Sequence, residues 1–391
     1  MNPRIASLSV ERFRALREIR IAGLGRVNLI TGRNNTGKSS LLEALRILLS
    51  GASPAVVRSI LDEREEDLGS AGDAHRSDAM DGLFQLSTLF CGFPQLFENP
   101  GPLVIATTGD PRPMRLTLGV DRFLVRTADD GMTPIGLGER ALGDDASIGP
   151  GLPALVLDID GREQILPLTY YGTSKGTAIL EAMRYQYQYR DASPRAELGE
   201  RMSVPCVYVG PYAGKQTSGL GALWDTIALS DREPDVVDAL RIIDPRIVAV
   251  SMVGGDGPHT RRTAIVRAEN LPRPVPLRTY GDGLNRLFGI VLSLVNAKDG
   301  LLLVDEFENG MHHSVQLDAW RAIFRLAARL NIQVFATSHS WDAIEAFQKA
   351  AAETPEHGVL VRLTRKGEHI VPTVYCEEDL RVATRDRIEV R

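Results

Sequence analysis

The fold-determining stretch occupies residues 32–39 and has the sequence Gly32-Arg33-Asn34-Asn35-Thr36-Gly37-Lys38-Ser39, which fits the pattern G-x-x-x-x-G-K-[ST]. Glycines let the backbone come close to a phosphate, so that several N–H groups can point at it. Lys38 would reach the β and γ phosphates, and Ser39 would offer its hydroxyl to Mg²⁺. The stretch therefore predicts a loop that binds the phosphates of a nucleotide.

The flanks of this loop support the prediction. The apolar residues Val27, Leu29 and Ile30 indicate a short buried strand, and the leucines at 41, 42, 45, 48 and 49 recur at helical spacing. A strand before and a helix after is the context that such a loop requires, and this context argues against a chance glycine-rich turn. The candidate nucleotide contacts are Gly32, Arg33, Asn34, Asn35, Thr36, Gly37, Lys38, Ser39 and Ser40.

A second set of candidate residues follows the apolar run at residues 301–304, which ends in Asp305 and Glu306. In a parallel sheet, catalytic groups lie at the carboxyl ends of the strands. We expect Asp305 to bind Mg²⁺ together with Ser39, and Glu306 to accept the proton of the attacking water. An exposed acidic turn after a core strand is the alternative, and the phosphate loop upstream argues against it.

A histidine follows the next predicted strand. Residues 332–336 are apolar apart from Gln333, and Thr337, Ser338 and His339 come directly after them. An imidazole at this position could bind the γ-phosphate and sense its loss. A structural or merely exposed histidine is the alternative, but the position one helix after the acidic pair favours function. The candidate catalytic residues are therefore Lys38, Glu306 and His339.

Size and composition limit the class of protein. The chain has 391 residues, of which 43% are hydrophobic, and its formal net charge is −5. Such a length suggests two domains or one domain with an insertion, and an acidic balance argues against nucleic-acid binding by bulk charge alone. The three cysteines are far apart, the longest apolar runs fall well short of the roughly 20 residues of a membrane span, and no signal-peptide pattern is present. We expect a soluble cytoplasmic protein with reduced thiols.

The order of these motifs resembles that of the ABC-type ATPases of the SMC, RecF and OLD group. The run from Asp305 to Ser314 is similar to the corresponding stretch of OLD-like and related AAA-family ATPases. The resemblance covers residues 1–50 and about 204–345. It implies an α/β P-loop fold with an ABC-type head, ATP and Mg²⁺ as cofactors, and ATP hydrolysis.

The resemblance also implies a domain organisation. Residues 1–50 and 204–391 would form the ATPase head, with its closing strands near residues 359–363 and 370–374. Residues 51–203 change in character, with helical patterns at residues 80–91 and 179–191 and short strand-like runs at residues 103–106, 116–118, 123–125 and 154–157. We expect an inserted helical and antiparallel lobe there. A Toprim nuclease domain would follow His339, but only about fifty residues remain, so we expect none in this chain.

Members of this family carry a signature helix that binds the ATP of the other subunit. The candidate is the stretch at residues 279–286, in which Gly281 and Gly283 would contact the partner's γ-phosphate. Tyr280 departs from the pattern, because serine is common at its position. An ordinary turn followed by a helix cap is the alternative. Residues 308–311 would form the D-loop, which faces the partner.

A glutamine usually completes the Mg²⁺ shell in this family, on the loop after a middle strand. Gln216 is the candidate, and Gln85 and Gln164 are alternatives that the sequence does not decide between. Arg12 and Arg14 lie near the first strand, and we expect them to be solvated surface charges; a position close to the nucleotide is the alternative.

Two further patterns resemble metal sites, but each of them is better explained in another way. Asp158 and Asp160 form a D-x-D, but Asp-Gly after a strand is typical of a hairpin turn. His312 and His313 are adjacent, and adjacent residues on a helix do not face one another. We expect a turn in the first case and D-loop neighbours in the second.

The resemblance leads to three functional hypotheses. The first is an ATP-gated head-to-tail homodimer that controls a separate effector, such as a Toprim-type nuclease, in anti-phage defence or DNA maintenance. The second is a RecF-type repair ATPase that binds DNA directly, and the third is a nucleotide-stabilised scaffold with negligible turnover. The sequence leaves DNA binding open.

Overall fold

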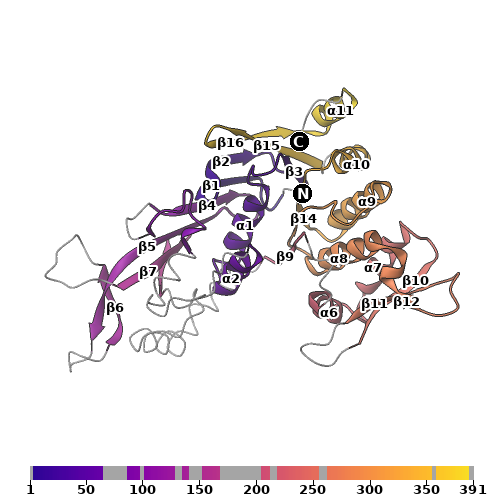
Figure 1. Cartoon of the computed structure of the whole chain (residues 1–391), viewed down its shortest axis with the longest axis horizontal. Coiled ribbons are helices and arrows are strands. Elements are labelled where there is room, and N and C mark those ends of the chain that lie inside the picture. Colours follow the sequence, from indigo (N-terminus) through magenta and orange to yellow (C-terminus); the bar gives the residue numbers. More distant parts are fainter. Residues whose placement is uncertain are drawn as a thin grey trace, which may run out of the picture.

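The structure is a computed structural model that describes residues 3–64, 86–96, 101–127, 134–140, 152–167, 204–211, 218–254, 262–354 and 358–386. Within these residues, two large sheets enclose helix α1 (Lys38–Leu49), and a row of helices covers the other face of one sheet (Figure 1). Among the described helices, none is long and apolar enough to cross a membrane.

The sheet that carries the motifs has six strands in the described part of the chain, in the order β16-β15-β3-β14-β13-β9. Its strands are β3 (Val27–Gly32), β9 (Cys206–Val209), β13 (Leu301–Val304), β14 (Gln333–Ser338), β15 (Gly358–Lys366) and β16 (His369–Tyr375). All are parallel except the edge strand β16. Parallel strands end at one edge, so the segments after β3, β13 and β14 emerge together there. The α/β fold and its closing strands are as expected from the sequence.

The central strands are apolar on both faces because both faces are covered. Leu29, Leu302 and Val334 pack with the helices α8 (Asp282–Asn296), α9 (His313–Arg329) and α10 (Trp341–Ala352). Ile30, Leu303 and Phe335 point the other way and pack with α1. Alternation along each strand therefore divides the apolar residues between two cores, which fixes the sheet between its two layers.

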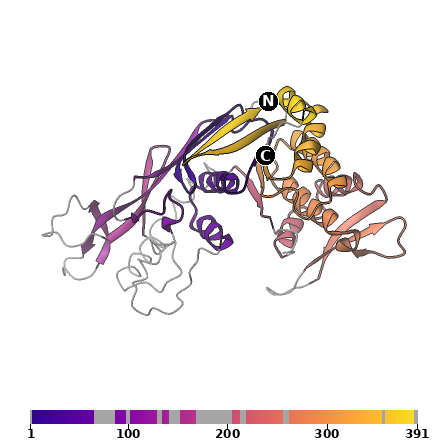
Figure 2. The same ribbon diagram turned by 45° about the horizontal axis from the view of Figure 1, so that its top comes forward.

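The second sheet is antiparallel and joins the N-terminus to the middle of the chain. Its main path is β2-β1-β4-β5-β7-β8, with β6 paired to β5. The strands are β1 (Ser7–Phe13), β2 (Leu16–Ala22), β4 (Leu103–Thr108), β5 (Met114–Thr127), β6 (Pro134–Arg140), β7 (Leu152–Ile159) and β8 (Arg162–Pro167). In Figure 2 the magenta strands of this sheet extend to the side of the molecule opposite the orange helices.

This antiparallel sheet crosses the domain boundary that we expected at residue 50. Strand β1 pairs with β4 from Ser7↔Thr108 to Glu11↔Val104, so the first residues and the expected lobe share one sheet. Leu8 and Val10 of β1 lie in the same core as Leu116 and Leu118 of β5. The short strands expected at residues 116–118 and 123–125 are parts of the single strand β5.

The remaining elements lie in three places. They are α2 (Pro54–Glu63), α6 (Ser218–Asp225), α7 (Glu233–Arg241), β10 (Ile247–Val253), β11 (Thr263–Ala268), β12 (Val275–Pro276), a 3₁₀ helix (Leu277–Tyr280) and α11 (Glu377–Arg385). Helix α2 lies beside α1, α11 lies beside α10 and β15, and the others lie on the α8 side of the molecule. Strands β10, β11 and β12 form a small sheet beside α7. The helix expected at residues 179–191 lies outside the described residues, as does the first half of the one expected at residues 80–91.

Candidate functional site

The phosphate loop needs its glycines for steric reasons. Gly32 has φ 147°, and a Cβ there would lie 2.6 Å from the backbone oxygen of Leu363 on β15. Gly37 has φ 81°, and its Cβ would lie 2.7 Å from a methyl carbon of Leu16. Both angles are unfavourable for residues with side chains. The loop can therefore turn from β3 into α1 beneath β15 only with glycine at these positions.

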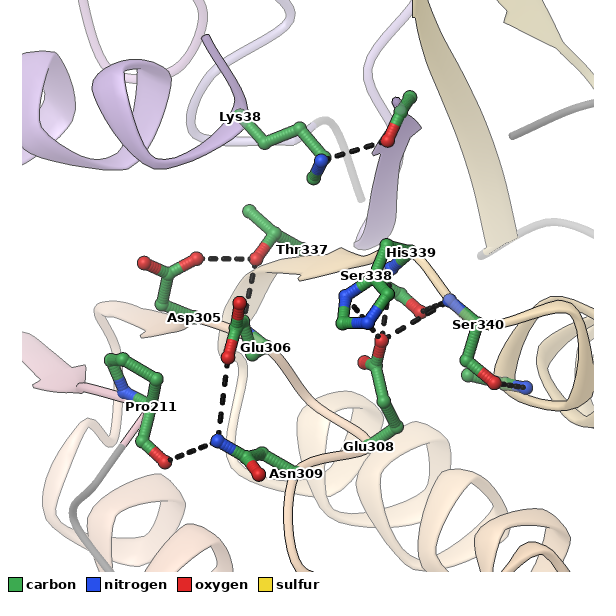
Figure 3. Close-up of polar contacts among 12 residues, drawn as sticks. Lys38, Pro211, Asp305, Glu306, Glu308, Asn309, Thr337, Ser338, His339 and Ser340 are labelled. Atoms are coloured by element: carbon green, nitrogen blue, oxygen red, sulfur yellow. Dashed lines mark hydrogen bonds and ion pairs between the residues drawn. The ribbon is translucent and has the colours of Figure 1, made fainter. Parts of the chain in front are cut away.

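Lys38 lies across this loop. Its Nζ donates hydrogen bonds to the carbonyl oxygens of Gly32, at 2.7 Å, and Arg33, at 3.0 Å. Burial lowers the pKa of Lys38, and the negative charges of Asp305, Glu308 and Glu306 act against that shift. The ammonium group is thus close enough to interact with the acidic residues after β13, as Figure 3 also shows.

A cavity of about 560 Å³ contains both predicted motifs. This volume lies within the usual range for small-molecule sites. Gly32 and Arg33 are not among its lining residues; they contact Lys38 instead. Residues from six separate parts of the chain line the cavity: Arg14, Ala15, Arg17, Asn34, Asn35, Thr36, Gly37, Lys38, Ser39, Ser40, Arg64, Thr88, Cys91, Gly92, Phe93, Asp305, Glu306, Arg365 and Glu368.

Thr337 at the end of β14 holds the acidic pair. Its hydroxyl donates to the carboxylate of Asp305 and accepts the backbone N–H of Glu306 at 2.8 Å. Thr337 is fully buried, and Asp305 is 5% exposed. Glu306 has φ 47°, a conformation that is rare for residues with a side chain and that these contacts maintain. Thr337 on β14 thus holds in place the two acidic residues that follow β13.

Two more side chains fix the segment after β13. Arg286 of α8 is 3% exposed and donates to the carbonyl oxygens of Gly210 (2.7 Å), Asp305 (3.0 Å) and Glu306 (3.3 Å). Burial lowers the pKa of Arg286, and the charge of Asp305 opposes this. Asn309 donates to the carboxylate of Glu306 at 3.3 Å, so the predicted base is held at its side chain as well as its backbone.

His339 emerges beside this segment at the end of β14. Its side chain is 52% exposed, and its Nδ1 lies 3.1 Å from Oε1 of Glu308 (Figure 3). It is not among the residues that line the 560 Å³ cavity. The fold therefore brings His339 to the same sheet edge as Glu306, where its ring is open to solvent and held by one carboxylate.

The signature candidate lines a different cavity. Gly281 has φ 98° and caps α8, whose N-terminus has no side-chain cap. A cavity of about 830 Å³ is lined by residues 280–284, by Gly310, His312 and Val315, and by residues 243–246. This cavity and the 560 Å³ cavity share no lining residue. Gly281 and Gly283 are therefore not placed at the phosphate loop of their own chain.

Arg14 differs from the expectation of a solvated surface charge. It is 7% exposed, and its Nε lies 2.6 Å from the carboxylate of Glu43 on α1. Arg64 pairs with the same carboxylate at 2.7 Å. Burial raises the pKa of Glu43, and the two guanidinium groups oppose the shift. The β1–β2 hairpin folds over α1, so Arg14 lines the cavity; Arg12 is exposed as expected.

The prediction that His312 and His313 do not face one another is wrong. Their ring centroids are 4.0 Å apart, because His312 is not helical. It is the extended N-cap of α9, and its Nδ1 accepts the N–H of Ser314. The D-x-D is a hairpin turn, as predicted: Asp160 and Gly161 have φ 51° and 84° between β7 and β8.

The candidates for the third Mg²⁺ ligand stay undecided. Gln216 and Gln85 lie outside the described residues. Gln164 lies on β8 of the antiparallel sheet and does not line the 560 Å³ cavity.

Sequence reasoning gave no individual role to several residues that the structure places at this site. Thr337, Glu308 and Asn309 lie inside the quoted motifs, and Arg286 ends the signature stretch. The available signal was a polar residue directly after a buried strand, which indicates position but not the partner. Their partners lie on other strands or helices, so only the fold identifies them.

Two family models match parts of the chain. The model described as "AAA domain, putative AbiEii toxin, Type IV TA system" matches residues 211–344, and the model described as "AAA ATPase domain" matches residues 4–79. The second range contains the phosphate loop, and the first contains Asp305, Glu306 and His339. The matches therefore cover the predicted motifs of the candidate site but not the lining residues at 88–93 and 365–368.

The chain is also similar to individual proteins. It is 23% identical over 387 residues to a Helicobacter pylori protein named ATP/GTP phosphatase, covering 96% of each chain. Among solved structures, it is similar to an Smc head bound to the C-winged helix domain of ScpA (TM-score 0.49, 10% identity, 96% of this chain and 98% of that one). It is similar as well to the SMC head domain from Thermotoga maritima (TM-score 0.44, 12% identity, 95% and 99%).

The sequence matches and the geometry of the site agree on the activity of the protein. The phosphate loop, the acidic pair and the histidine lie after three adjacent parallel strands, beside a second, antiparallel sheet. One cavity joins the phosphate loop to the acidic pair. With the two AAA-type matches, these features support a P-loop ATPase.

Proposed function

We propose that this ATPase is a switch in which two copies pair head to tail, each completing the ATP site of the other. The separation of the two cavities carries the proposal: Lys38 and Glu306 line one, and Gly281 and Gly283 line the other. The free N–H groups at a helix N-terminus bind phosphate well. Since α8 presents its N-terminus away from its own phosphate loop, the γ-phosphate that it binds belongs to a second copy.

The donor atoms in the cavity fit Mg²⁺. Ser39 and Asp305 both line it and offer hydroxyl and carboxylate oxygens, the ligands that this ion prefers. When bound there, Mg²⁺ would neutralise charge on the β and γ phosphates. The hydroxyl of Thr337 orients the Asp305 carboxylate toward this role.

The protein's own groups divide the chemistry. Lys38 binds the β and γ phosphates in place of the carbonyl oxygens it now contacts. Glu306 accepts the proton of the attacking water, and Asn309 keeps its carboxylate in position. His339 contacts the γ-phosphate from the end of β14. Loss of that phosphate removes the contacts that favour the closed pair, so hydrolysis shifts the population back to separate copies.

The switch would act on a separate effector. The match to a model whose description includes a toxin system supports a role in phage defence or DNA maintenance, with a Toprim-type nuclease as the effector we favour. The name of the Helicobacter relative supports hydrolysis of GTP as well as ATP. The net charge of −5 favours an effector protein over DNA as the main partner.

The test is the mass of Glu306→Gln in solution, measured by light scattering with and without Mg-ATP. ATP should convert a smaller species to a dimer, and adding Lys38→Ala should abolish the change. Gly283→Ala should also weaken the dimer. A Cβ at Gly283 meets only ordinary contacts, the nearest at 3.6 Å, so its own chain accepts the methyl group while the partner's phosphate does not.

Gly289→Ala is the matched control, because Gly289 lies in the same helix with its nearest Cβ contact at 3.7 Å, from Leu220. It should dimerise normally. A mass that ATP does not change in Glu306→Gln would contradict the switch. Turnover unchanged by Glu306→Gln would favour the scaffold, and ATP-dependent binding of duplex DNA that Lys38→Ala abolishes would favour the RecF-type alternative.

A further inference from the structure

Glu308 makes an unusual set of contacts between the acidic pair and the histidine. It belongs to the segment after β13, and its side chain is 10% exposed. Its Oε1 accepts the backbone N–H of His339 at 2.9 Å and that of Ser340 at 3.1 Å. The Nδ1 of His339 lies 3.1 Å from the same oxygen. One carboxylate oxygen therefore contacts both the backbone and the ring of the histidine.

The backbone contacts hold the Glu308 carboxylate in a fixed position. Ser340 is the N-cap of α10, and Glu308 satisfies N–H groups directly before that helix. The neighbouring Phe307 is fully buried, and its ring stacks on Trp320 with centroids 3.9 Å apart. The N–H of Phe307 also donates to the carbonyl oxygen of Thr337 at 2.9 Å. Glu308 thus extends from a segment that cannot shift without disrupting the core.

The ring contact favours one position for the proton of His339. An ionised carboxylate accepts hydrogen bonds and cannot donate them, so the Glu308 oxygen 3.1 Å from Nδ1 favours a proton on Nδ1. In a neutral imidazole, Nε2 is then the free nitrogen, on the other side of the ring. The ring is 52% exposed, so Nε2 is accessible to a ligand.

We infer that Glu308 is a positioning residue that fixes the orientation and tautomer of His339, so that Nε2 is presented to the γ-phosphate. The inference rests on the role proposed above for His339. Asn309, the next residue, binds the carboxylate of Glu306. One short segment thereby sets both the base that activates water and the imidazole that contacts the phosphate, which keeps their spacing constant.

The contact is tested by NMR of the full-length protein labelled with ¹⁵N-histidine, using His339→Gln to assign the ring signals. Wild-type His339 should carry its proton on Nδ1. Glu308→Ala should shift it toward the Nε2–H form that free histidine favours, whereas Glu308→Gln should retain the wild-type form because its amide oxygen still accepts. Asp342→Ala is the matched control: it removes an exposed acid from the first turn of α10 without touching the ring. A wild-type tautomer in Glu308→Ala would overturn the inference.

ATPase rates test the consequence of the contact. Glu308→Ala should lower kcat by about tenfold to 100-fold, the usual loss when a partner that orients a reactive group is removed, with a smaller change in KM. On the His339→Ala background it should cause little further loss, because the two residues act together. An equal loss on both backgrounds would overturn positioning through His339. If Glu308→Ala does not fold, Glu308→Asp replaces it, because aspartate keeps the charge and withdraws it from the ring. Glu308→Asp should also lower kcat, and it should cause little further loss on the His339→Ala background.

The failures of the two proposals can be told apart. A kcat unchanged in His339→Ala would reject the proposed role of His339 in the ATPase reaction. The NMR measurement needs no turnover, so it would still decide whether Glu308 fixes the tautomer.

Discussion

Replacement of Thr337 by valine should separate the two acidic residues from the strand that holds them. Valine keeps the branched shape of threonine and removes only the hydroxyl. The N–H of Glu306, now 2.8 Å from that hydroxyl, and the carboxylate of Asp305 both lose this partner. A buried group left without its partner costs about 1–3 kcal/mol. Thr337 is fully buried and Glu306 partly exposed, so we expect a loss of about 2–4 kcal/mol in the free energy of unfolding.

Thr337→Ser is the matched comparison, because it keeps the hydroxyl and removes one buried methyl group. That change should cost about 1 kcal/mol. Valine should therefore be the more damaging substitution, although it buries more apolar surface. It should also lower kcat, since Asp305 and Glu306 lose their fixed relation to the phosphate loop.

Urea unfolding followed by tryptophan fluorescence measures the difference. Trp320 stacks on Phe307, the residue after Glu306, and so reports on this part of the core. A chain of this size need not unfold in one step, so the midpoint of the tryptophan transition is the quantity to compare. A Thr337→Val midpoint equal to or above that of Thr337→Ser would refute the reasoning, because it would mean that the hydroxyl does not link the two strands.

Two further predictions concern the phosphate loop and the thiols. Gly32→Ala should destabilise the protein by about 2 kcal/mol or more and abolish nucleotide binding, because its Cβ would lie 2.6 Å from the backbone oxygen of Leu363. The control Gly367→Ala, where the Cβ meets nothing, should cost about 1 kcal/mol and leave binding intact. Equal losses of stability for the two variants in thermal unfolding would contradict this prediction. Burial raises the pKa of Cys206 to about 12, so little thiolate exists at pH 8. Iodoacetamide should therefore label the exposed Cys376 first, and the labelling of Cys206 should accelerate as the pH rises toward its pKa. Equal labelling rates for the two thiols at pH 8, measured by mass spectrometry, would show that the Cys206 thiol is not buried.

Much of the head follows from local sequence. The phosphate loop is predictable because its chemistry needs glycine, lysine and serine at fixed spacing within eight residues. The strands β3, β13 and β14 are predictable because they are buried on both faces and are mostly apolar, and the helices α1 and α8 show their periodicity. Lys38, Asp305 and Glu306 could be assigned to one site from the rule that parallel strands end at the same edge. The domain division at residues 50 and 203 remains a prediction.

The tertiary structure decided the contacts between segments that are distant in sequence. Strand β1 pairs with β4, about a hundred residues later, and this pairing depends on the register of two whole strands. Arg14 looks like a surface charge in its own segment, but the hairpin folds over α1 and buries it against Glu43. Thr337 and Glu308 likewise bind groups that lie about thirty residues away. The sequence by itself determined which residue types lie at the strand ends, because local steric and hydrophobic constraints place the strands. Only the fold determined which of these residues contact one another, because hydrogen bonding and burial depend on partners from other strands and helices.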